Sequence, residues 1–149
     1  MEGERGLSIK ESNNVEGTSD KLVGMKVLVV EDNVLNLEIV SEVLSERGLI
    51  VTTAENGQVA VELFQNNSPG TFDVILMDMH MPIMGGVEAT KIIRAMKHAD
   101  AQKIPILALT ANDFEEDIRR TREAGMNDHL TKPFDMEKIF EALVAHTGK

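Results

Sequence analysis

The chain has 149 residues, 25 acidic against 15 basic side chains, a formal net charge of −10 and no cysteine. This length suits one domain with a substantial core and leaves no room for a second catalytic or DNA-binding module. The absence of cysteine excludes disulfides and zinc–thiolate sites, and it favours a reducing, cytoplasmic location. The acidic balance argues against direct nucleic-acid binding, and no apolar run approaches the roughly 20 residues of a membrane span. We therefore expect a soluble protein whose partners are proteins.

Residues 1–24 combine acidic side chains with Gly, Ser and Asn and have no sustained apolar period, which is typical of a flexible tail or linker. From residue 25 to residue 146, strand-like apolar runs alternate with segments of helical period. This alternation predicts right-handed βαβ units. The expected fold is therefore α/β, a doubly wound sheet of five parallel strands with helices on both faces.

The apolar runs predict five strands, over 25–30, 50–54, 72–77, 104–109 and 127–131. The helical periods predict helices over 34–47, 57–66, 87–97 and 113–122, and a last helix in which Met136, Ile139, Phe140 and Leu143 share one face. Asn56 is the expected N-cap of the second helix, and Gly48 the C-terminal cap of the first.

Two helices differ in the apolar face that they offer to the core. The helix at 57–66 is expected to bury Val59 and Leu63, with Phe64 as a further candidate. The helix at 113–122 is highly charged, and it has only Phe114 and Ile118 to face inward. We expect it to be the least firmly docked of the helices.

Polar side chains follow four of the predicted strands. Glu31 and Asp32 come after the first strand, Asp78 after the third, Thr110 after the fourth and Lys132 after the fifth. Because the carboxyl ends of parallel strands meet at one edge of a sheet, we expect these side chains to converge. Each pair of carboxylates about 4 Å apart costs roughly 1 kcal/mol in water and about 4 kcal/mol at an effective dielectric near 20. A cation is therefore expected between them.

Mg²⁺ is the cofactor that this set of ligands predicts. It prefers carboxylate and carbonyl oxygens, retained water and a substrate phosphate. Glu31, Asp32 and Asp78 are the expected metal ligands, and the backbone carbonyl of His80 is a further candidate.

The remaining two residues suit phosphate chemistry. The ammonium group of Lys132 can pair with a carboxylate or with a phosphoryl oxygen, and the Thr110 hydroxyl can donate to another oxygen. Together they predict transfer of a phosphoryl group to the Asp78 carboxylate, which is a weak nucleophile until the charge on both reactants is offset. Asp78, Lys132 and Thr110 are the predicted catalytic residues.

Five segments of the chain also carry a family resemblance: Val30-Glu31-Asp32-Asn33 with Asn36, Asp78-Met79-His80-Met81-Pro82, Gly86, Leu109-Thr110-Ala111 and Lys132-Pro133-Phe134. In order and spacing they resemble the receiver domains of two-component response regulators and hybrid histidine kinases, over about residues 25–146. The first segment is most similar to receivers that are attached to hybrid kinases.

The resemblance implies a flavodoxin-like strand order, 2-1-3-4-5. It implies that Asp78 accepts a phosphoryl group from a phosphohistidine, on a histidine kinase or on a histidine phosphotransfer protein. Such a domain catalyses its own phosphorylation and dephosphorylation but turns over no metabolite, so the chain is expected to be a signalling module and not an enzyme.

The resemblance also implies a switch. In receivers the threonine, here Thr110, moves toward the phosphoryl group and an aromatic residue on the fifth strand rotates inward behind it. That aromatic position is occupied here by His129. Because histidine is titratable and forms hydrogen bonds, we expect a weaker or pH-sensitive switch of the surface formed by residues 113–146.

Three further positions depart from the family pattern or vary within it. Gly85 stands where many relatives have aspartate, and we expect only a looser loop. His80 and Asn112 occupy positions that help to set the lifetime of the phosphoryl group, which the sequence leaves open.

Each site residue has a plainer interpretation when it is taken alone. Glu31 and Asp32 are typical of a solvated cluster at the start of a helix, Thr110 of a helix cap, and Lys132-Pro133 of a strand exit. Their joint position at the ends of strands is what favours the functional interpretation.

Other functions compete with the phosphoacceptor. A Mg²⁺-dependent phosphatase with an aspartyl nucleophile generally has a second acid two residues later, where this chain has His80. His80 and His129 lack the spacing of zinc ligands. Retention of all five pocket residues argues against a degenerate receiver that acts only as a scaffold, although His129 leaves the output step open. A transcription factor is disfavoured because the chain has no basic helix-turn-helix. The sequence does not resolve how the module produces its output. The alternatives are docking of a partner on 113–146, a phosphorylation-linked dimer there, and onward relay of the phosphoryl group.

Overall fold

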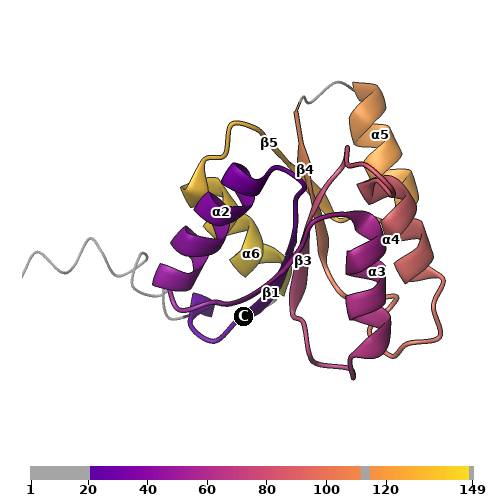
Figure 1. Ribbon diagram of the computed structural model, residues 1–149, viewed down its shortest axis with the longest axis horizontal. Coiled ribbons are helices and arrows are strands. Elements are labelled where there is room, and N and C mark those ends of the chain that lie inside the picture. The colour runs from indigo at the N-terminus through magenta and orange to yellow at the C-terminus, as the bar shows by residue number, and fades with distance from the viewer. Residues whose placement is uncertain (1–20, 112–114, 148–149) are drawn as a thin grey trace, which may run out of the picture.

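The computed structural model describes residues 21–111 and 115–147. Its sheet has five parallel strands: β1 (Lys26–Val30), β2 (Ile50–Ala54), β3 (Val74–Asp78), β4 (Ile106–Thr110) and β5 (Asp128–Thr131). The strand order is β2-β1-β3-β4-β5, which confirms the flavodoxin-like order. β3 therefore lies at the centre of the sheet, between the strand that precedes Glu31 and the strand that ends at Thr110 (Figure 1).

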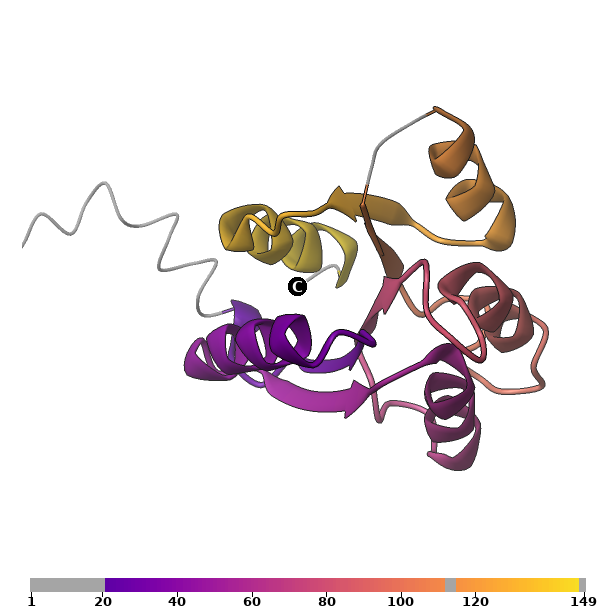
Figure 2. The ribbon, with the colours of Figure 1, turned by 45° about the horizontal axis from the view of Figure 1, so that its top comes forward.

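The helices lie on both faces of the sheet, as predicted: α2 (Val34–Glu46), α3 (Gly57–Asn66), α4 (Gly86–Arg94), α5 (Glu115–Ala124) and α6 (Met136–Thr147). Figures 1 and 2 show α2 and α6 on one face and α3, α4 and α5 on the other. This arrangement makes the fold doubly wound, with ligand sites expected at the carboxyl ends of the strands.

Each face of the sheet has its own apolar core. The core under α3 and α4 includes Leu28, Phe64, Ile75, Ile93 and Ile106, all fully or almost fully buried. The core under α2 and α6 includes Val29, Leu44, Leu76, Leu107 and Phe140. Because both faces of the sheet are covered, the central strands are continuous apolar runs and not alternating ones, as parallel sheets require.

Local side-chain chemistry sets the ends of the first two helices. Asn33 and Asn56 are the N-caps, and their side-chain oxygens each accept a hydrogen bond of 2.9 Å, from the backbone N–H of Asn36 and of Val59. Gly48 follows α2 with φ of +93°, a left-handed conformation that favours glycine. The predicted caps at Asn56 and Gly48 are confirmed.

Two strands begin later than the apolar runs predicted. The strand expected at 72–77 is Val74–Asp78, and the one expected at 104–109 is Ile106–Thr110. Pro105 explains the second shift, because proline has no N–H to donate to the ladder. Asp78 and Thr110 are therefore the last residues of their strands, and not the first residues after them.

Two helices also differ from their predicted bounds. The helix expected at 87–97 is Gly86–Arg94, and the one expected at 113–122 is described over Glu115–Ala124. Phe114 lies outside the described residues, so its predicted inward position is not tested. The other predicted strand and helix bounds agree with the structure to within one residue.

The buried face of α3 was only partly predicted. Val59 and Leu63 are partly buried and pack against the core, whereas Ala60, Val61 and Phe64 are buried. The prediction was right for Phe64, but it missed Ala60 and Val61, which are buried in place of Val59 and Leu63.

The packed part of the chain reaches into the segment expected to be a tail. Leu22 is completely buried against the α2 and α6 core, and Gly24 N–H donates to the Gly48 carbonyl at 2.8 Å. The packed unit therefore includes Leu22. Among the helices of the described ranges, none has the length and apolar character needed to cross a bilayer.

Candidate functional site

Three carboxylates meet at the carboxyl edge of the sheet. One oxygen from each of Glu31, Asp32 and Asp78 lies within 4.8 Å of the other two. Glu31 and Asp78 are only 1% and 3% exposed, whereas Asp32 is exposed to solvent. The predicted convergence of these three residues is confirmed.

Backbone hydrogen bonds at the ends of the strands hold the two buried carboxylates. Glu31 N–H donates to the Ala54 carbonyl at 3.0 Å and so extends the ladder between β1 and β2. Met79 N–H donates to the Leu109 carbonyl at 3.1 Å and fixes the chain directly after Asp78. The two carboxylates are therefore positioned by the sheet itself and not by a separate loop.

Lys132 brings the compensating charge. Its Nζ lies 3.2 Å from Glu31 Oε1 and 3.4 Å from Asp78 Oδ1. Its backbone N–H donates to the Thr110 carbonyl at 2.7 Å, so the end of β4 positions it. Glu31 Oε1 makes no aligned hydrogen bond, although it lies within ion-pair distance of Lys132. The contact is therefore electrostatic, and this buried oxygen keeps an unused acceptor site.

The electrostatics of Asp78 are unusual for an aspartate. Burial, and then the negative charge of Glu31, raise the pKa of Asp78 to about 7, although the positive charge of Lys132 acts in the opposite direction. Hydrogen bonds with Asp32 and Glu31 contribute smaller shifts in the same direction as burial. One lysine is therefore insufficient to offset three adjacent carboxylates, and a further cation would lower this pKa.

The donor set fits Mg²⁺. Three carboxylates from two adjacent strand ends supply hard oxygen ligands, and the buried Glu31 Oε1 has a free acceptor position. The exposed side of the site, at Asp32, leaves access for water and for a phosphate group. In the described residues these are the side chains that can hold a metal in a group of three or more.

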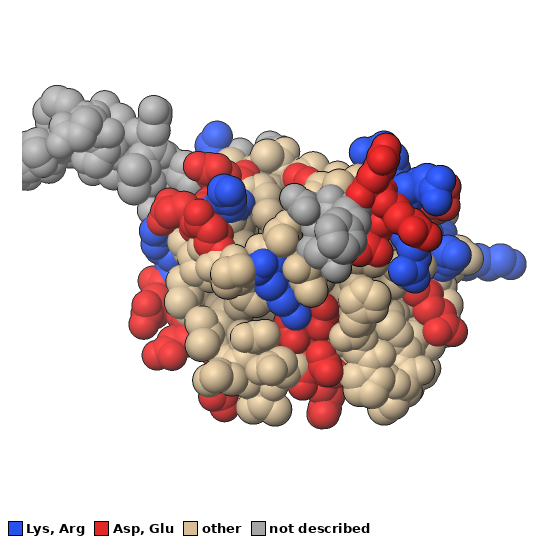
Figure 3. Space-filling model, turned by 90° about the horizontal axis from the view of Figure 1, so that it is seen from above, with Lys and Arg blue, Asp and Glu red and all other residues tan. Residues whose placement is uncertain are grey.

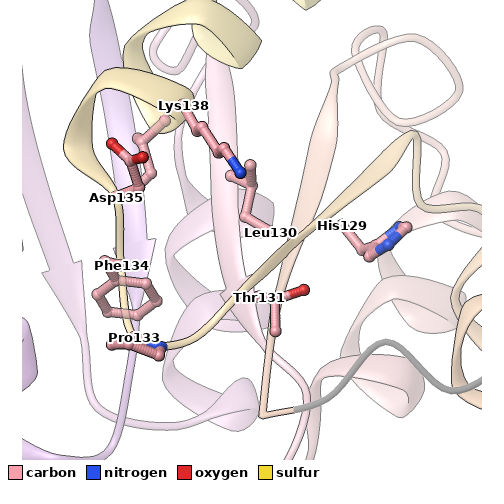
Figure 4. Close-up of a pocket in the computed structure, with 8 residues that line it drawn as sticks. His129, Leu130, Thr131, Pro133, Phe134, Asp135 and Lys138 are labelled. Atoms are coloured by element: carbon pink, nitrogen blue, oxygen red, sulfur yellow. The ribbon is translucent and has the colours of Figure 1, made fainter.

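The remaining predicted residues lie around this centre. Thr110 is 2% exposed at the end of β4, beside Thr131 in the register of β5. The His80 side chain is exposed and lines a groove between α4 and α5. His129 is half-buried in β5, and Figure 4 shows its ring and the Leu130 side chain extending from opposite sides of the strand. Asn112 lies outside the described residues.

Gly86 has a structural role that the motif alone did not explain. A Cβ atom at this position would lie 2.2 Å from the Asp78 carbonyl oxygen. The Gly86 N–H also donates to the Met79 carbonyl at 2.9 Å. The start of α4 therefore packs directly on the backbone of Asp78, and only glycine fits there.

The apolar rim of the site was missed by the sequence analysis. Leu35 and Ile39 on α2 are 64% and 48% exposed, and Ile83 in the loop between β3 and α4 is 80% exposed with φ of +71°. Leu35 and Ile39 stand four residues apart, off the buried stripe of the helix, and that spacing was the available signal. Figure 3, which views the molecule from above, shows acidic atoms in a cleft. Uncharged surface flanks this cleft, over α2 on one side and over α3 and α4 on the other.

Comparison with known proteins identifies the relatives of this architecture. Residues 27–144 match the model of the response regulator receiver domain family. The hybrid signal transduction histidine kinase I of Dictyostelium discoideum is 34% identical over 134 residues, which are 89% of this chain and 8% of that relative. In eight such curated relatives the chain spans 5% to 14% of the relative's length.

Two solved structures are similar over most of the chain. The receiver domain of the sensor histidine kinase PA1611 from Pseudomonas aeruginosa, with magnesium coordinated in its active-site cleft, has a TM-score of 0.76 and 35% identity, and the match covers 85% of this chain and all of that one. The receiver domain of Ssk1 from Saccharomyces cerevisiae, in a co-crystal with the histidine phosphotransfer protein Ypd1, has a TM-score of 0.75 and 31% identity over 85% of this chain and 90% of that one.

Proposed function

The chain belongs to the response regulator receiver domain family of two-component phosphorelays, and we propose that Asp78 is the residue that accepts the phosphoryl group. One observation carries this assignment. Asp78 ends the central strand, and its carboxylate lies in the acidic triad while Lys132 Nζ contacts both it and Glu31. Groups from β1 on one side and from β4 and β5 on the other thus surround it.

We assign Mg²⁺ to Glu31, Asp32 and Asp78, with the His80 carbonyl as a further ligand. The magnesium-bound receiver of PA1611 supports this cofactor. When bound, the ion supplies positive charge that allows an anionic phosphate to approach an anionic carboxylate. Lys132 then orients a phosphoryl oxygen, and the Thr110 hydroxyl donates a hydrogen bond to another.

The proposed reaction is a direct transfer between side chains. A carboxylate oxygen of Asp78 attacks the phosphorus of a phosphohistidine, the P–N bond breaks, and the released imidazole takes a proton from solvent. Water later attacks the acyl phosphate and returns Asp78 to the carboxylate with release of inorganic phosphate. The module therefore catalyses its own phosphorylation and dephosphorylation without turning over a metabolite.

We further propose that Thr110 and His129 form the switch, with the surface of residues 113–146 as the region that responds. A phosphorylation-linked dimer through that surface is one form that the output can take. The pH sensitivity expected from His129 stays a prediction. Identical phosphorylation-dependent NMR shifts around 110–130 at pH 6 and pH 8 would contradict it.

The proposed donor is a histidine phosphotransfer protein or a histidine kinase, and we propose that it meets the receiver in the cytoplasm. The receiver unit spans about residues 25–146 and also packs Leu22. The co-crystal of Ypd1 with Ssk1 supports a donor of this kind. We place its docking surface on the rim formed by Leu35, Ile39 and Ile83. These side chains are exposed and apolar, and Ile83 is held at a positive φ that is rare for a β-branched residue.

The site assignment is tested by peptide mapping after transfer. The chain is incubated with a phosphorylated histidine phosphotransfer protein and Mg²⁺, and the acyl phosphate is reduced with borohydride, which converts the modified aspartate to homoserine. We expect homoserine at position 78. Glu55→Gln, which changes an exposed carboxylate just past β2, is the matched control and should not alter labelling. Homoserine at another aspartate would overturn the assignment.

The docking surface is tested by comparing two donors. In Leu35→Ala/Ile39→Ala, the ratio of the transfer rate from the protein donor to that from acetyl phosphate should fall about thirtyfold, since two contacts worth roughly 1 kcal/mol each are lost. Val23→Ala/Ile50→Ala removes two equally exposed apolar side chains away from this rim and should leave the ratio unchanged. An equal change in both double variants would exclude this surface.

A further inference from the structure

Arg94, the last residue of α4, makes an unusual set of contacts at the opposite edge of the sheet from Asp78. Its Nε and Nη2 donate to the Gly125 carbonyl at 3.0 and 2.9 Å, and its Nη1 donates to the Ala101 carbonyl at 3.0 Å. Nη2 also donates to Asn127 Oδ1 at 3.0 Å. All of these acceptors are neutral, and within the described residues Arg94 has no ion pair with a carboxylate.

The connection between α5 and β5 is built around this guanidinium. Gly125 has φ of +106°, and a Cβ atom there would lie 3.1 Å from Arg94 Cγ. Asn127 Oδ1 also accepts a hydrogen bond of 2.8 Å from the Ile106 N–H, at the start of β4. The half-buried Arg94 therefore joins α4, β4 and the connection from α5 to β5.

α5 is held mainly at its C-terminal end. Its buried residues are Thr121 and Ala124, both small and both in its second half. Its first turn begins with the exposed Glu115 and Glu116. Gly125 follows the last residue of the helix, so the contacts with Arg94 lie where the burial of α5 is also concentrated. α5 packs beside α4 on the same face of the sheet (Figure 2).

The other end of α4 lies at the acidic site. Gly86, its first residue, packs on the carbonyl of Asp78. A short helix is a stiff element, so α4 connects the backbone of Asp78 with the contacts of Arg94. The start of α5, by contrast, has no comparable attachment among the described residues.

We propose that Arg94 is the anchor of a hinge, which fixes the C-terminal end of α5 so that this helix turns about residues 125–127. The part of this proposal that concerns movement upon phosphorylation rests on the proposed function. Arg94 is thus a positioning residue for the responding surface, and it does not contact the reacting atoms.

Hydrogen exchange of the full chain, followed by mass spectrometry, tests the anchor without phosphorylation. In Arg94→Ala the exchange of amides 121–127 should rise at least about tenfold, while amides in β1 and α3 change no more than in Ile93→Val. Ile93 is fully buried on the same helix, so this control lowers stability without removing the contacts. Arg94→Lys, which keeps the charge but not the fork of donors, should give an intermediate increase and serves if Arg94→Ala does not fold.

The same experiment with acetyl phosphate and Mg²⁺ tests the movement. In the wild type the phosphorylation-dependent change should be confined to residues 115–120, and in Arg94→Ala it should spread through residues 121–131. Two results would overturn the hinge. One is an exchange profile of Arg94→Ala that matches that of Ile93→Val, and the other is a phosphorylation-dependent change in the wild type that is as large at 121–127 as at 115–120. Intact mass reports phosphorylation independently, so an absent mass gain would count against the proposed function while the first comparison still decides the anchor.

Discussion

Asp78 carries a charge that its surroundings oppose when no metal is bound. It is 3% exposed, it lies beside Glu31, and its pKa is raised to about 7. In an unfolded chain an aspartate has a pKa near 3.9, so the folded protein binds this proton more tightly than the unfolded chain. The folded state is therefore least stable, relative to the unfolded state, when the Asp78 carboxylate is ionised.

Asp78→Asn should increase the free energy of unfolding in EDTA at pH 8, by on the order of 4 kcal/mol. The sign follows from the raised pKa. The loss of stability that ionised Asp78 causes in the folded wild type is absent below about pH 4, grows as the pH rises toward 7 and is fully present above it. Urea unfolding at pH 4 and pH 8 measures the difference, and Glu31 still pairs with Lys132 in the variant. A variant that is less stable than the wild type at pH 8 would contradict this account.

Gly86→Ala tests the contact between α4 and Asp78, the proposed phosphoacceptor. Because the added Cβ would meet the Asp78 carbonyl oxygen, the backbone must shift, at a cost of about 1–3 kcal/mol. We expect lower stability together with slower phosphorylation by acetyl phosphate, measured by urea unfolding and by intact mass. Unchanged stability would show that the loop before α4 adapts without moving Asp78.

At the scale of single residues, the sequence predicted which side chains converge but not how each is exposed. Asp78 ends a strand and Glu31 and Lys132 directly follow strands, and parallel strands bring such positions together whatever the details of packing. That Glu31 is buried while its neighbour Asp32 is exposed depends on the turn of the chain after β1, which no periodicity records. The positive φ of Ile83 likewise has no signal in a β-branched residue.

At the scale of elements, the bounds of the helix predicted at 57–66 were right, but only part of its buried face was predicted. Gly57 explains the difference, because a Cβ there would lie 2.6 Å from the Met84 carbonyl oxygen and 3.0 Å from Ala89 Cβ. α3 and α4 therefore approach each other closely through small residues. Apolar periodicity gives most weight to large side chains, so it directed the prediction to Val59 and Leu63.

The element that precedes β1 makes a direct prediction about stability. Leu22 is completely buried against the α2 and α6 core, so Leu22→Ala should lower the free energy of unfolding by about 2–5 kcal/mol. Val23→Ala, at a neighbouring position that is 63% exposed, should change it by less than about 0.5 kcal/mol. Urea unfolding of both variants compares them, and equal midpoints would mean that the segment before β1 does not contribute to the core.

At the scale of the whole molecule, strand runs and helical periods were enough to predict a parallel α/β sheet with five strands. The order of the strands was not contained in these patterns, because any right-handed βαβ arrangement satisfies them. It came from the family resemblance, and the structure confirms it. The order matters for function because it places Asp78 at the centre of the sheet and the two sets of partner groups on either side.

The charge of the whole chain agrees with a protein donor and not with a nucleic-acid partner. The balance is −10, and the acidic cleft lies between uncharged areas of surface (Figure 3). In the proposed relay, the donor would therefore bring an apolar contact area and a phosphoryl group to this edge.

The intact mass of the chain after incubation with acetyl phosphate, with and without Mg²⁺, tests the central claim most directly. The wild type should gain the mass of one phosphoryl group only when Mg²⁺ is present, and Asp78→Asn should gain none. An equal gain in the folded variant, or a gain that is independent of Mg²⁺, would contradict the assignment of Asp78 as the magnesium-dependent phosphoacceptor.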